Sequence, residues 1–320
     1  MFNQDLINSI LIEPISRGAN KLLIVSGYAS HTMASWHLKK IKDLGLPLIN
    51  IELIVGMALY DGLKKDIHQG FKDIQSNNNH NLYSHFQCQY VIEQSPVHSK
   101  VYIWLNNDLP VEAYTGSANY SQAGFSLGRR EYMVPCDPNQ AFQYYNNLVN
   151  DSMFCNHNDI EDYITLMASH HVLENEMENS SIIFDNNFEK VTLSLLDTRT
   201  NNTHLKSGLN WGQRNNREPN QAYIPIPSKV AKSGFFPLES KHFSVLTDDH
   251  KNLVLRVQQQ GNKALTTPMN NSLIGEYFRN RLGLNNGQFV TRQHLEDYGR
   301  TDVTFYKLDD EQFYMDFSPH

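Results

Sequence analysis

The segment Val97-His98-Ser99-Lys100, followed by the apolar run Val101-Tyr102-Ile103-Trp104-Leu105, predicts a β-strand with two basic side chains at its start. The apolar run is rich in β-branched and aromatic residues and begins shortly after Pro96, as strands often do. Side chains two residues apart on a strand point to the same side. His98 and Lys100 are therefore expected to lie together.

A second motif, Thr115-Gly116-Ser117-Ala118-Asn119-Tyr120-Ser121, ends another β-rich stretch, 111–115. The connection 106–110 is rich in Asn, Asp and Pro, which predicts a hairpin between the two strands. This hairpin would bring Gly116–Asn119 beside the start of the first strand, so that an imidazole, an ammonium and an amide converge. Gly116 is expected to let a phosphate approach the backbone closely.

These groups suit attack on a phosphodiester without a metal. An imidazole can attack phosphorus and a second imidazole can protonate the leaving oxygen, while Lys100 and Asn119 hold the non-bridging oxygens. His-x-Lys also occurs at 37–39 and 204–206, but no Gly-Ser-x-Asn turn follows either copy. The linked pattern singles out His98, whose alternative role is that of a structural histidine at a strand end.

Together the two motifs resemble those of the phospholipase D superfamily. The next element, 129–134, is similar to the strand that carries a glutamate in the nuclease branch of that superfamily. In the catalytic set that this resemblance implies, the histidine is the nucleophile, the lysine and asparagine bind phosphate, and the glutamate orients the histidine. The members of the set are His98, Lys100, Asn119, Glu131 and, as a weaker addition, Ser117.

Position 105 favours nucleases over lipases. Many phospholipase D enzymes carry an Asp five residues after the Lys, and this chain has Leu105 there. Nuclease-branch members share this departure, so Glu131 is expected to replace the missing carboxylate; the alternative is a solvated glutamate beside two arginines. The superfamily uses two facing motifs and this chain has one complete copy. The resemblance therefore implies a homodimer with one shared active site.

Length and composition bound the class of protein. The chain has 320 residues, of which 40% are hydrophobic and 19% charged, so it can form two domains of ordinary size. It has no uninterrupted apolar run of about 18 residues and does not start like a signal peptide. We expect a cytoplasmic protein that does not act at a membrane. Its three cysteines are widely spaced and give no sign of a zinc site, so we expect no metal and no cofactor.

The first half of the chain alternates strand-like and helix-like segments, which predicts an α/β sheet. The predicted strands are 21–28, 51–56, 88–92, 101–105, 111–115 and 131–136. The predicted helices are 32–42, 61–74, 140–153 and 160–168, with a polar surface loop at 75–81. We assign residues 1–170 to a phospholipase D-like catalytic and dimerisation domain.

An acidic, turn-prone segment separates the halves. We assign residues 171–184 to a linker and 185–320 to a DNA-recognition domain. The simpler interpretation of the linker is a solvated tether. The alternative is that Glu174, Glu176 and Glu178 occupy the phosphate-binding cleft until DNA displaces them.

Short β segments predict a small β-barrel for the second domain. They are 190–196, 221–226, 242–246, 253–258 and 303–308, with a hairpin connection at 247–252 and a short helix at 275–284. Net charge is −7 overall, but residues 181–320 hold 16 Lys/Arg against 15 Asp/Glu, whereas residues 1–180 hold 11 against 19. The second half is therefore the better candidate for binding a polyanion.

Two polar insertions, 208–220 and 259–271, interrupt the predicted barrel and are rich in side chains that can hydrogen-bond base edges. They are either solvated connections or arms that read DNA. The candidate base contacts are Asn210, Trp211, Gln213, Arg214, Arg217, Asn220, Lys263, Thr266, Thr267, Asn270 and Asn271. Arg279 and Arg281 of the short helix are expected either to reach phosphates or to form its solvated face.

Residues 185–320 resemble the B3-like pseudobarrel that follows the phospholipase D domain in restriction endonucleases of the BfiI and NgoFVII group. The segments that carry the resemblance are 208–214, 235–237, 263–265, 298–302 and 316–318. In that fold two arms grip the major groove, and by position they are the two insertions. The domain order matches over nearly the whole chain.

The resemblance implies a type II restriction endonuclease of the IIS kind, which binds a short sequence of double-stranded DNA and cuts nearby through a phosphohistidine. A cognate DNA methyltransferase would be its partner in the same system. One alternative is a sequence-specific DNA-binding regulator with a degenerate nuclease domain. A phospholipase D-type lipid hydrolase is another, but it would leave the polar arms without a role, and no basic amphipathic helix suggests a membrane surface.

Overall fold

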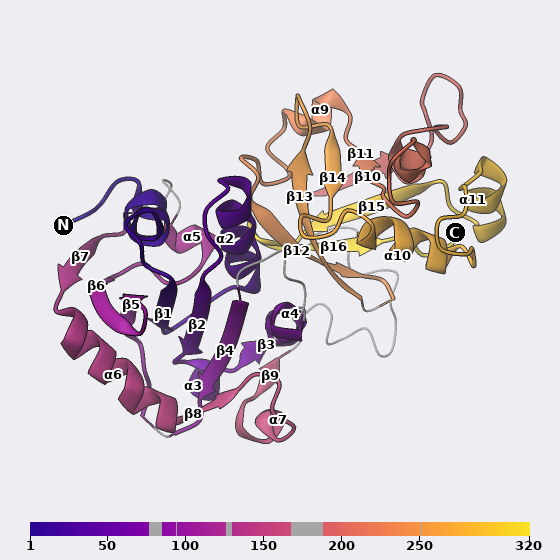
Figure 1. Cartoon of the computed structure of the whole chain (residues 1–320). Coiled ribbons are helices and arrows are strands. Elements are labelled where there is room, and N and C mark those ends of the chain that lie inside the picture. The colour runs from indigo at the N-terminus through magenta and orange to yellow at the C-terminus, as the bar shows by residue number, and fades with distance from the viewer. Residues whose placement is uncertain (77–84, 94, 126–129, 168–187, 250) are drawn as a thin grey trace. The chain divides into compact units, whose positions relative to one another are not determined.

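The computed structural model describes residues 1–76, 85–93, 95–125, 130–167, 188–249 and 251–320. The chain forms two compact units, Met1–His171 and Val172–His320 (Figure 1). The predicted linker 171–184, with Glu174, Glu176 and Glu178, lies outside the described residues, as do both predicted domain boundaries and most of the loop 75–81. Each unit is described by itself.

A seven-stranded mixed sheet forms the centre of the first unit, in the order β7-β6-β5-β1-β2-β4-β8. Its strands are β1 Lys21–Ser26, β2 Asn50–Val55, β4 His85–Val91, β5 Lys100–Asn106, β6 Leu109–Gly116, β7 Met133–Cys136 and β8 Ser152–Phe154. β1, β2 and β4 run parallel, whereas β5, β6, β7 and β8 are each antiparallel to their neighbours. The predicted α/β sheet is confirmed.

Helices pack around this sheet. They are η1 Ile7–Ile12 (a π-helix), α1 Glu13–Ser16, α2 His31–Asp43, α3 Ala58–Asp61, α4 Lys65–Ser76, α5 Gln122–Phe125, α6 Pro138–Asn150 and α7 Ile160–Tyr163. α2 begins where the Ser30 hydroxyl accepts from Met33 N, and α6 begins where the Asp137 carboxylate accepts from Gln140 N. Both helices were predicted within a few residues of these bounds.

The predicted helix 61–74 is wrong in its first turn. Gly62 has φ of 72°, which ends α3, and the chain then forms β3 (Leu63–Lys64) before α4 begins. β3 pairs in parallel with β9 (Leu166–Met167). This pairing also explains why α7 stops at Tyr163 instead of continuing through the predicted range 160–168.

Both faces of β5 are buried, which explains the unbroken apolar run 101–105. On one face Val101, Ile103 and Leu105 share a core with residues of α6. On the other face Tyr102 donates a hydrogen bond to Ala118 O at 2.9 Å and Trp104 Nε1 donates to Ile10 O at 2.8 Å. The strand that begins at Lys100 is thus fixed from both sides.

The second unit is a seven-stranded, barrel-like sheet in the order β10-β15-β16-β12-β13-β14-β11. Its strands are β10 Lys190–Ser194, β11 Ile224–Pro225, β12 His242–Thr247, β13 Asn252–Gln258, β14 Ala264–Thr266, β15 Asp302–Lys307 and β16 Gln312–Asp316. β12 and β16 are parallel and the other neighbours antiparallel. The helices are η4 Gly208–Gln213 (a 3-10 helix), α9 Ser228–Ala231, α10 Leu273–Arg281 and α11 Arg292–Tyr298.

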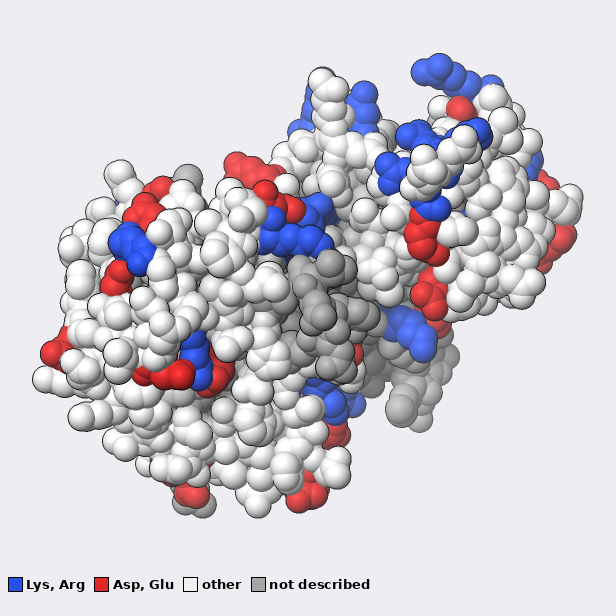
Figure 2. Space-filling model, in the orientation of Figure 1, with Lys and Arg blue, Asp and Glu red and all other residues white. Residues whose placement is uncertain are grey.

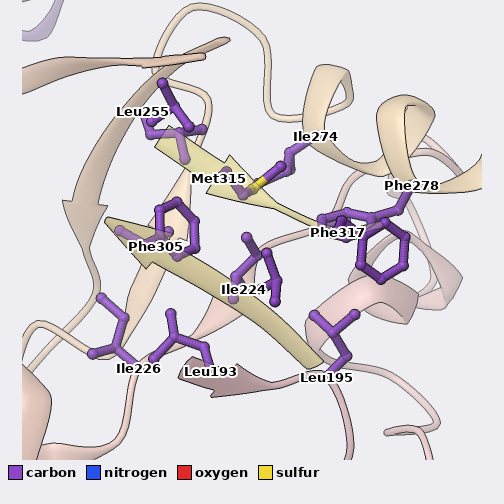
Figure 3. Close-up of a cluster of buried hydrophobic side chains, with 14 of the residues drawn as sticks. Leu193, Leu195, Ile224, Ile226, Leu255, Ile274, Phe278, Phe305, Met315 and Phe317 are labelled. Atoms are coloured by element: carbon purple, nitrogen blue, oxygen red, sulfur yellow. The ribbon is translucent and has the colours of Figure 1, made fainter. Parts of the chain in front are cut away.

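One apolar core fills the second unit (Figure 3). Strands supply Leu193, Leu255 and Phe305, and α10 adds Ile274 and Phe278, all of them completely buried. The predicted β-barrel is therefore confirmed. Two of its strands, β14 and β16, were not predicted. β14 was missed because it lies within a sequence stretch that appeared to be a polar insertion.

Candidate active site and DNA-binding surface

The strand directions bring four short segments to one edge of the first sheet. β5 is antiparallel to β1, with Lys100 opposite Ser26, and β6 is antiparallel to β5, with Thr115 opposite Val101. β7 in turn is antiparallel to β6. The starts of β5 and β7 therefore meet the ends of β1 and β6. The predicted catalytic residues all lie at this edge.

His98 and Lys100 lie together, as predicted. His98 is exposed, whereas Lys100 is only 6% exposed. Lys100 Nζ is 3.1 Å from His98 Nδ1 and 3.3 Å from Nε2, and it donates to His98 O at 2.6 Å. Burial lowers the pKa of Lys100, an effect that the charge of Glu131 opposes. An ammonium is thus fixed beside an accessible imidazole.

Two glycines allow the backbone around His98 to pack closely against its neighbours. A Cβ atom at Gly27 would lie 3.1 Å from His98 Cδ2, and one at Gly56 would lie 2.0 Å from Val97 O. Gly27 N also donates to Ser99 O at 3.1 Å. Neither glycine was predicted as part of the site. The signal that could have found them is a glycine directly after, or at the end of, each of two buried strands.

The side chain of Asn119 is oriented by the end of β1. Its Oδ1 accepts from Tyr28 N at 3.1 Å and lies 3.3 Å from Ser26 Oγ. Ser26 is completely buried, donates to Tyr28 O at 2.6 Å and accepts from Tyr120 N at 2.9 Å. Among the described residues no acceptor is seen for the amide hydrogens of Asn119, so they can be donated to another acceptor, such as a phosphate oxygen.

Ser117 and Glu131 form a pair across β6 and β7. The Ser117 hydroxyl donates to the Glu131 carboxylate and accepts from Tyr132 N at 3.1 Å. Ser117 is thus a hydrogen-bond donor to this carboxylate. The negative charge of Glu131 opposes the lowering of the Lys100 pKa by burial. Ser117 therefore fixes the Glu131 carboxylate, whose charge acts on Lys100.

The packing around Gly116 gives a structural reason for a glycine at this position. A Cβ atom there would lie 2.1 Å from Tyr132 O, so the glycine is needed for contact between β6 and the segment that precedes β7. Leu105, at the position where other superfamily members carry Asp, is 1% exposed and belongs to the core shared with α6. A carboxylate at this position would be buried in an apolar environment.

Five of the predicted DNA contacts are buried: Asn210, Asn220, Thr266, Thr267 and Arg279. Asn210 donates to His204 O at 2.9 Å and Val290 O at 2.8 Å, and accepts from Val290 N at 2.8 Å. Arg279 is 0% exposed and donates to three backbone carbonyls, those of Gln288, Gly275 and Leu209. These side chains hold loops to the barrel, and the prediction that they contact DNA is corrected.

The remaining corrections concern Asn220, the second insertion and Arg281. Thr266 lies in β14 and donates to Gln258 Oε1 at 3.0 Å, and Thr267 donates to Asn270 O at 2.6 Å. Asn220 Oδ1 accepts from Gly287 N at 2.7 Å. Arg281 makes two hydrogen bonds to the Asp248 carboxylate, at 2.9 and 2.6 Å, and so belongs to an internal ion pair.

Two family models match this chain. Residues 4–162 match the NgoFVII restriction endonuclease N-terminal PLD domain, and residues 184–309 match the NgoFVII C-terminal B3-like DNA-binding domain. The chain belongs to the NgoFVII restriction endonuclease family. This confirms the predicted order of a phospholipase D-like nuclease domain and a B3-like domain, and it makes the protein an endodeoxyribonuclease that binds DNA.

Several solved structures are similar to parts of this NgoFVII-family endonuclease. NucT from Helicobacter pylori is 18% identical over 47% of this chain and 91% of its own, with a TM-score of 0.33. Polyphosphate kinase from Porphyromonas gingivalis is 16% identical over 46% of this chain and 22% of its own, with a TM-score of 0.28. A hypothetical Arabidopsis thaliana protein is 14% identical over 41% of this chain and 90% of its own, with a TM-score of 0.22. No curated protein matched the chain.

Among the described residues of the endonuclease, no helix has the length and apolarity needed to span a membrane. Lys and Arg side chains gather on the second unit over α9 and the η4 segment (Figure 2). The predicted contacts that stay exposed are Arg214, Arg217, Lys263 and Asn270, and those that are half-buried are Trp211, Gln213 and Asn271.

Trp211 and Arg217 form a stacked pair on the first insertion of the endonuclease. The guanidinium carbon of Arg217 lies 3.9 Å from the centre of the Trp211 ring, and Nη1 donates to Gln221 Oε1 at 2.8 Å. Trp211 in turn packs edge to face on Tyr223, with 5.6 Å between ring centres. Stacking holds the guanidinium flat and leaves it further donors for an acceptor outside the protein.

Proposed function

We propose that this chain is a type IIS restriction endonuclease that hydrolyses DNA phosphodiesters without a metal, through a phosphohistidine. The observation that carries the proposal is the meeting of an exposed imidazole, a buried ammonium and an oriented amide at one sheet edge. His98, Lys100 and Asn119 supply these groups. Ser117 and Glu131 support them from β6 and β7.

The reaction has two displacements. In the first, a ring nitrogen of His98 forms a bond to phosphorus and the bond from phosphorus to the leaving oxygen breaks, while a second histidine gives that oxygen a proton. In the second, water attacks phosphorus, the phosphorus–nitrogen bond breaks, and the second histidine takes a proton from the water. Lys100 and Asn119 stabilise the charge on the non-bridging oxygens in both steps.

A second histidine must face the first, and we assign it to His98 of another copy. The chain carries one His-x-Lys motif that is linked to a Gly-Ser-x-Asn turn. A homodimer with one shared active site therefore supplies both the nucleophile and the acid. Two-fold symmetry would let the histidines exchange these roles.

Recognition belongs to the B3-like unit in this proposal. Arg217, stacked on Trp211, offers donors of the kind that pair with the O6 and N7 atoms of guanine. Arg214 and Lys263 are exposed and can contact further bases or phosphates. A host with such an enzyme needs a methyltransferase of the same sequence specificity to protect its own DNA.

Cleavage of unmethylated plasmid DNA in excess chelator tests the proposal. Wild type is expected to give discrete fragments, and His98→Ala is expected to give none. His157→Ala, which changes an exposed histidine on another part of the first unit, is the matched control. Cleavage that requires added Mg²⁺ would refute the metal-free mechanism. Intact DNA that still shifts in a gel would favour a binding protein with an inactive nuclease domain.

A further inference from the structure

Tyr28 lies in the active site but outside the motifs that identify it. It follows β1 by two residues and is 43% exposed, although it contacts both His98 and Asn119. Its backbone nitrogen donates to Asn119 Oδ1 at 3.1 Å. Its ring packs edge to face on the His98 imidazole, with 5.5 Å between ring centres and 79° between planes. One residue thus contacts both the nucleophile and a phosphate-binding side chain.

The imidazole of His98 has neighbours on more than one side. Gly27 lies so close that a Cβ atom there would be 3.1 Å from His98 Cδ2, and Lys100 Nζ lies at the ring nitrogens. The ring of Tyr28 adds a further contact and restricts rotation of an otherwise exposed side chain. Without it, the imidazole could rotate away toward solvent.

The phenol of Tyr28 is itself anchored. Its hydroxyl donates to the Asp61 carboxylate at the end of α3. α3 in turn is tied to the site, because Met57 N donates to Gly27 O at 3.0 Å and Asp61 N donates to Met57 O at 3.0 Å. The hydrogen bond to Asp61 raises the pKa of Tyr28, so the phenol stays protonated and remains a donor.

We propose that Tyr28 is a positioning residue for His98, with Asp61 as its anchor. The inference rests on the proposed function, since it assumes that His98 is the nucleophile. An imidazole that attacks phosphorus must lie in line with the leaving oxygen, and a misplacement of about 1 Å can cost about 10²-fold in rate. The edge-to-face contact limits the orientations of the ring before DNA binds. Tyr28 acts through His98 and is assigned no contact with the reacting atoms.

Single-turnover cleavage with saturating DNA tests the proposal, with the Kd for DNA and the melting temperature measured beside it. Tyr28→Ala removes ring and anchor and is expected to lower the cleavage rate by about 10²-fold while Kd stays unchanged. Tyr28→Phe and Asp61→Ala each remove only the anchor, and we expect about tenfold from either. The double variant that combines Tyr28→Phe with Asp61→Ala should cleave no more slowly than either single variant, because both substitutions break the same hydrogen bond.

Tyr163→Ala is the matched control, since this tyrosine of α7 is 46% exposed. A second readout needs no catalysis. In protein labelled with ¹⁵N-histidine, the His98 ring signals, assigned by their loss in His98→Ala, should change or broaden in Tyr28→Ala and return toward wild type in Tyr28→Phe. A purely structural tyrosine would lower the melting temperature without this graded effect on one histidine.

Four results would overturn the proposal or separate it from the proposed function. Cleavage by Tyr28→Ala at the wild-type rate refutes the positioning role. A loss of cleavage explained wholly by weaker DNA binding does so too, because Tyr28 would then be a substrate contact. If His98→Ala cleaves like wild type, the proposed function fails, and unchanged His98 signals in Tyr28→Ala would separately refute the positioning of the ring.

Discussion

Ser117 donates a hydrogen bond to the carboxylate of Glu131, and this bond joins β6 to the segment that precedes β7. The backbone reinforces it, because Ser117 N donates to Tyr132 O at 3.0 Å. The serine therefore fixes the carboxylate whose charge acts on Lys100.

We expect Ser117→Ala to slow cleavage by about tenfold, because a hydrogen bond to a charged group contributes about 1.5–3 kcal/mol. The Kd for DNA should change little, since Asn119 and Lys100 stay in place. Single-turnover kinetics and a gel shift measure the two effects. Ser76→Ala, an exposed serine of α4 that donates to Asp73 O, is the control. An undiminished rate would show that Glu131 needs no hydroxyl to hold it.

The alkaline limb of the pH–rate profile should report Lys100. Burial lowers its pKa, so the charged form is lost at a lower pH than for an exposed lysine, and cleavage should fall accordingly. Glu131→Gln removes the charge that raises this pKa and should move the limb to still lower pH. The Lys100→Arg variant keeps its positive charge at alkaline pH, so its cleavage rate should fall less as the pH rises. A limb that does not move in Glu131→Gln would contradict the coupling.

Acid stability should depend on His37. It is completely buried, its Nδ1 lies 3.0 Å from Tyr120 OH and its Nε2 lies 3.1 Å from Leu11 O. Burial lowers its pKa from 6.5 to about 4. Because the unfolded state takes up the proton first, the stability due to neutral His37 is complete above about pH 6.5 and is lost as pH falls toward 4, by about 3 kcal/mol in total.

Urea denaturation between pH 7 and 4 measures this loss. The pKa of His68 is lowered too, so the difference between wild type and His37→Gln isolates the contribution of His37. Glutamine can keep hydrogen bonds without titrating in this range. The free energy of unfolding of the His37→Gln variant should therefore fall less steeply than that of wild type as the pH is lowered. Equal slopes for the two proteins would refute the assignment.

Arg279 and Arg217 should behave oppositely when changed to alanine. Arg279→Ala leaves three buried carbonyls without their donor and should destabilise the second unit by about 3 kcal/mol or more. Arg217→Ala should leave the melting temperature unchanged and weaken specific DNA binding by about 1–3 kcal/mol. Lys307→Ala, on β15, is the control for a lost positive charge. Equal melting temperatures for Arg279→Ala and wild type would contradict the structural role.

The sequence by itself determined the parts of this endonuclease that depend on local pattern. The run 101–105 predicted β5, the helix-like pattern of 32–42 predicted α2, and the two linked motifs predicted which side chains meet at one sheet edge. These features follow from strand and helix periodicity and from turn residues, which act within a few positions of each other. The order of the two domains was predicted from the resemblance of both halves of the chain to a known restriction-endonuclease family, which the family matches confirm.

Only the tertiary structure decided which polar side chains are buried. In sequence, Arg279 and Arg217 are alike, yet one donates to carbonyls inside the barrel and the other is exposed and stacks on the half-buried indole of Trp211. The contact of Tyr28 with His98 was equally hidden, because it joins residues 70 positions apart. A polar residue can satisfy its hydrogen bonds with water or with distant backbone, and local sequence does not distinguish the two, because the partner is supplied by packing.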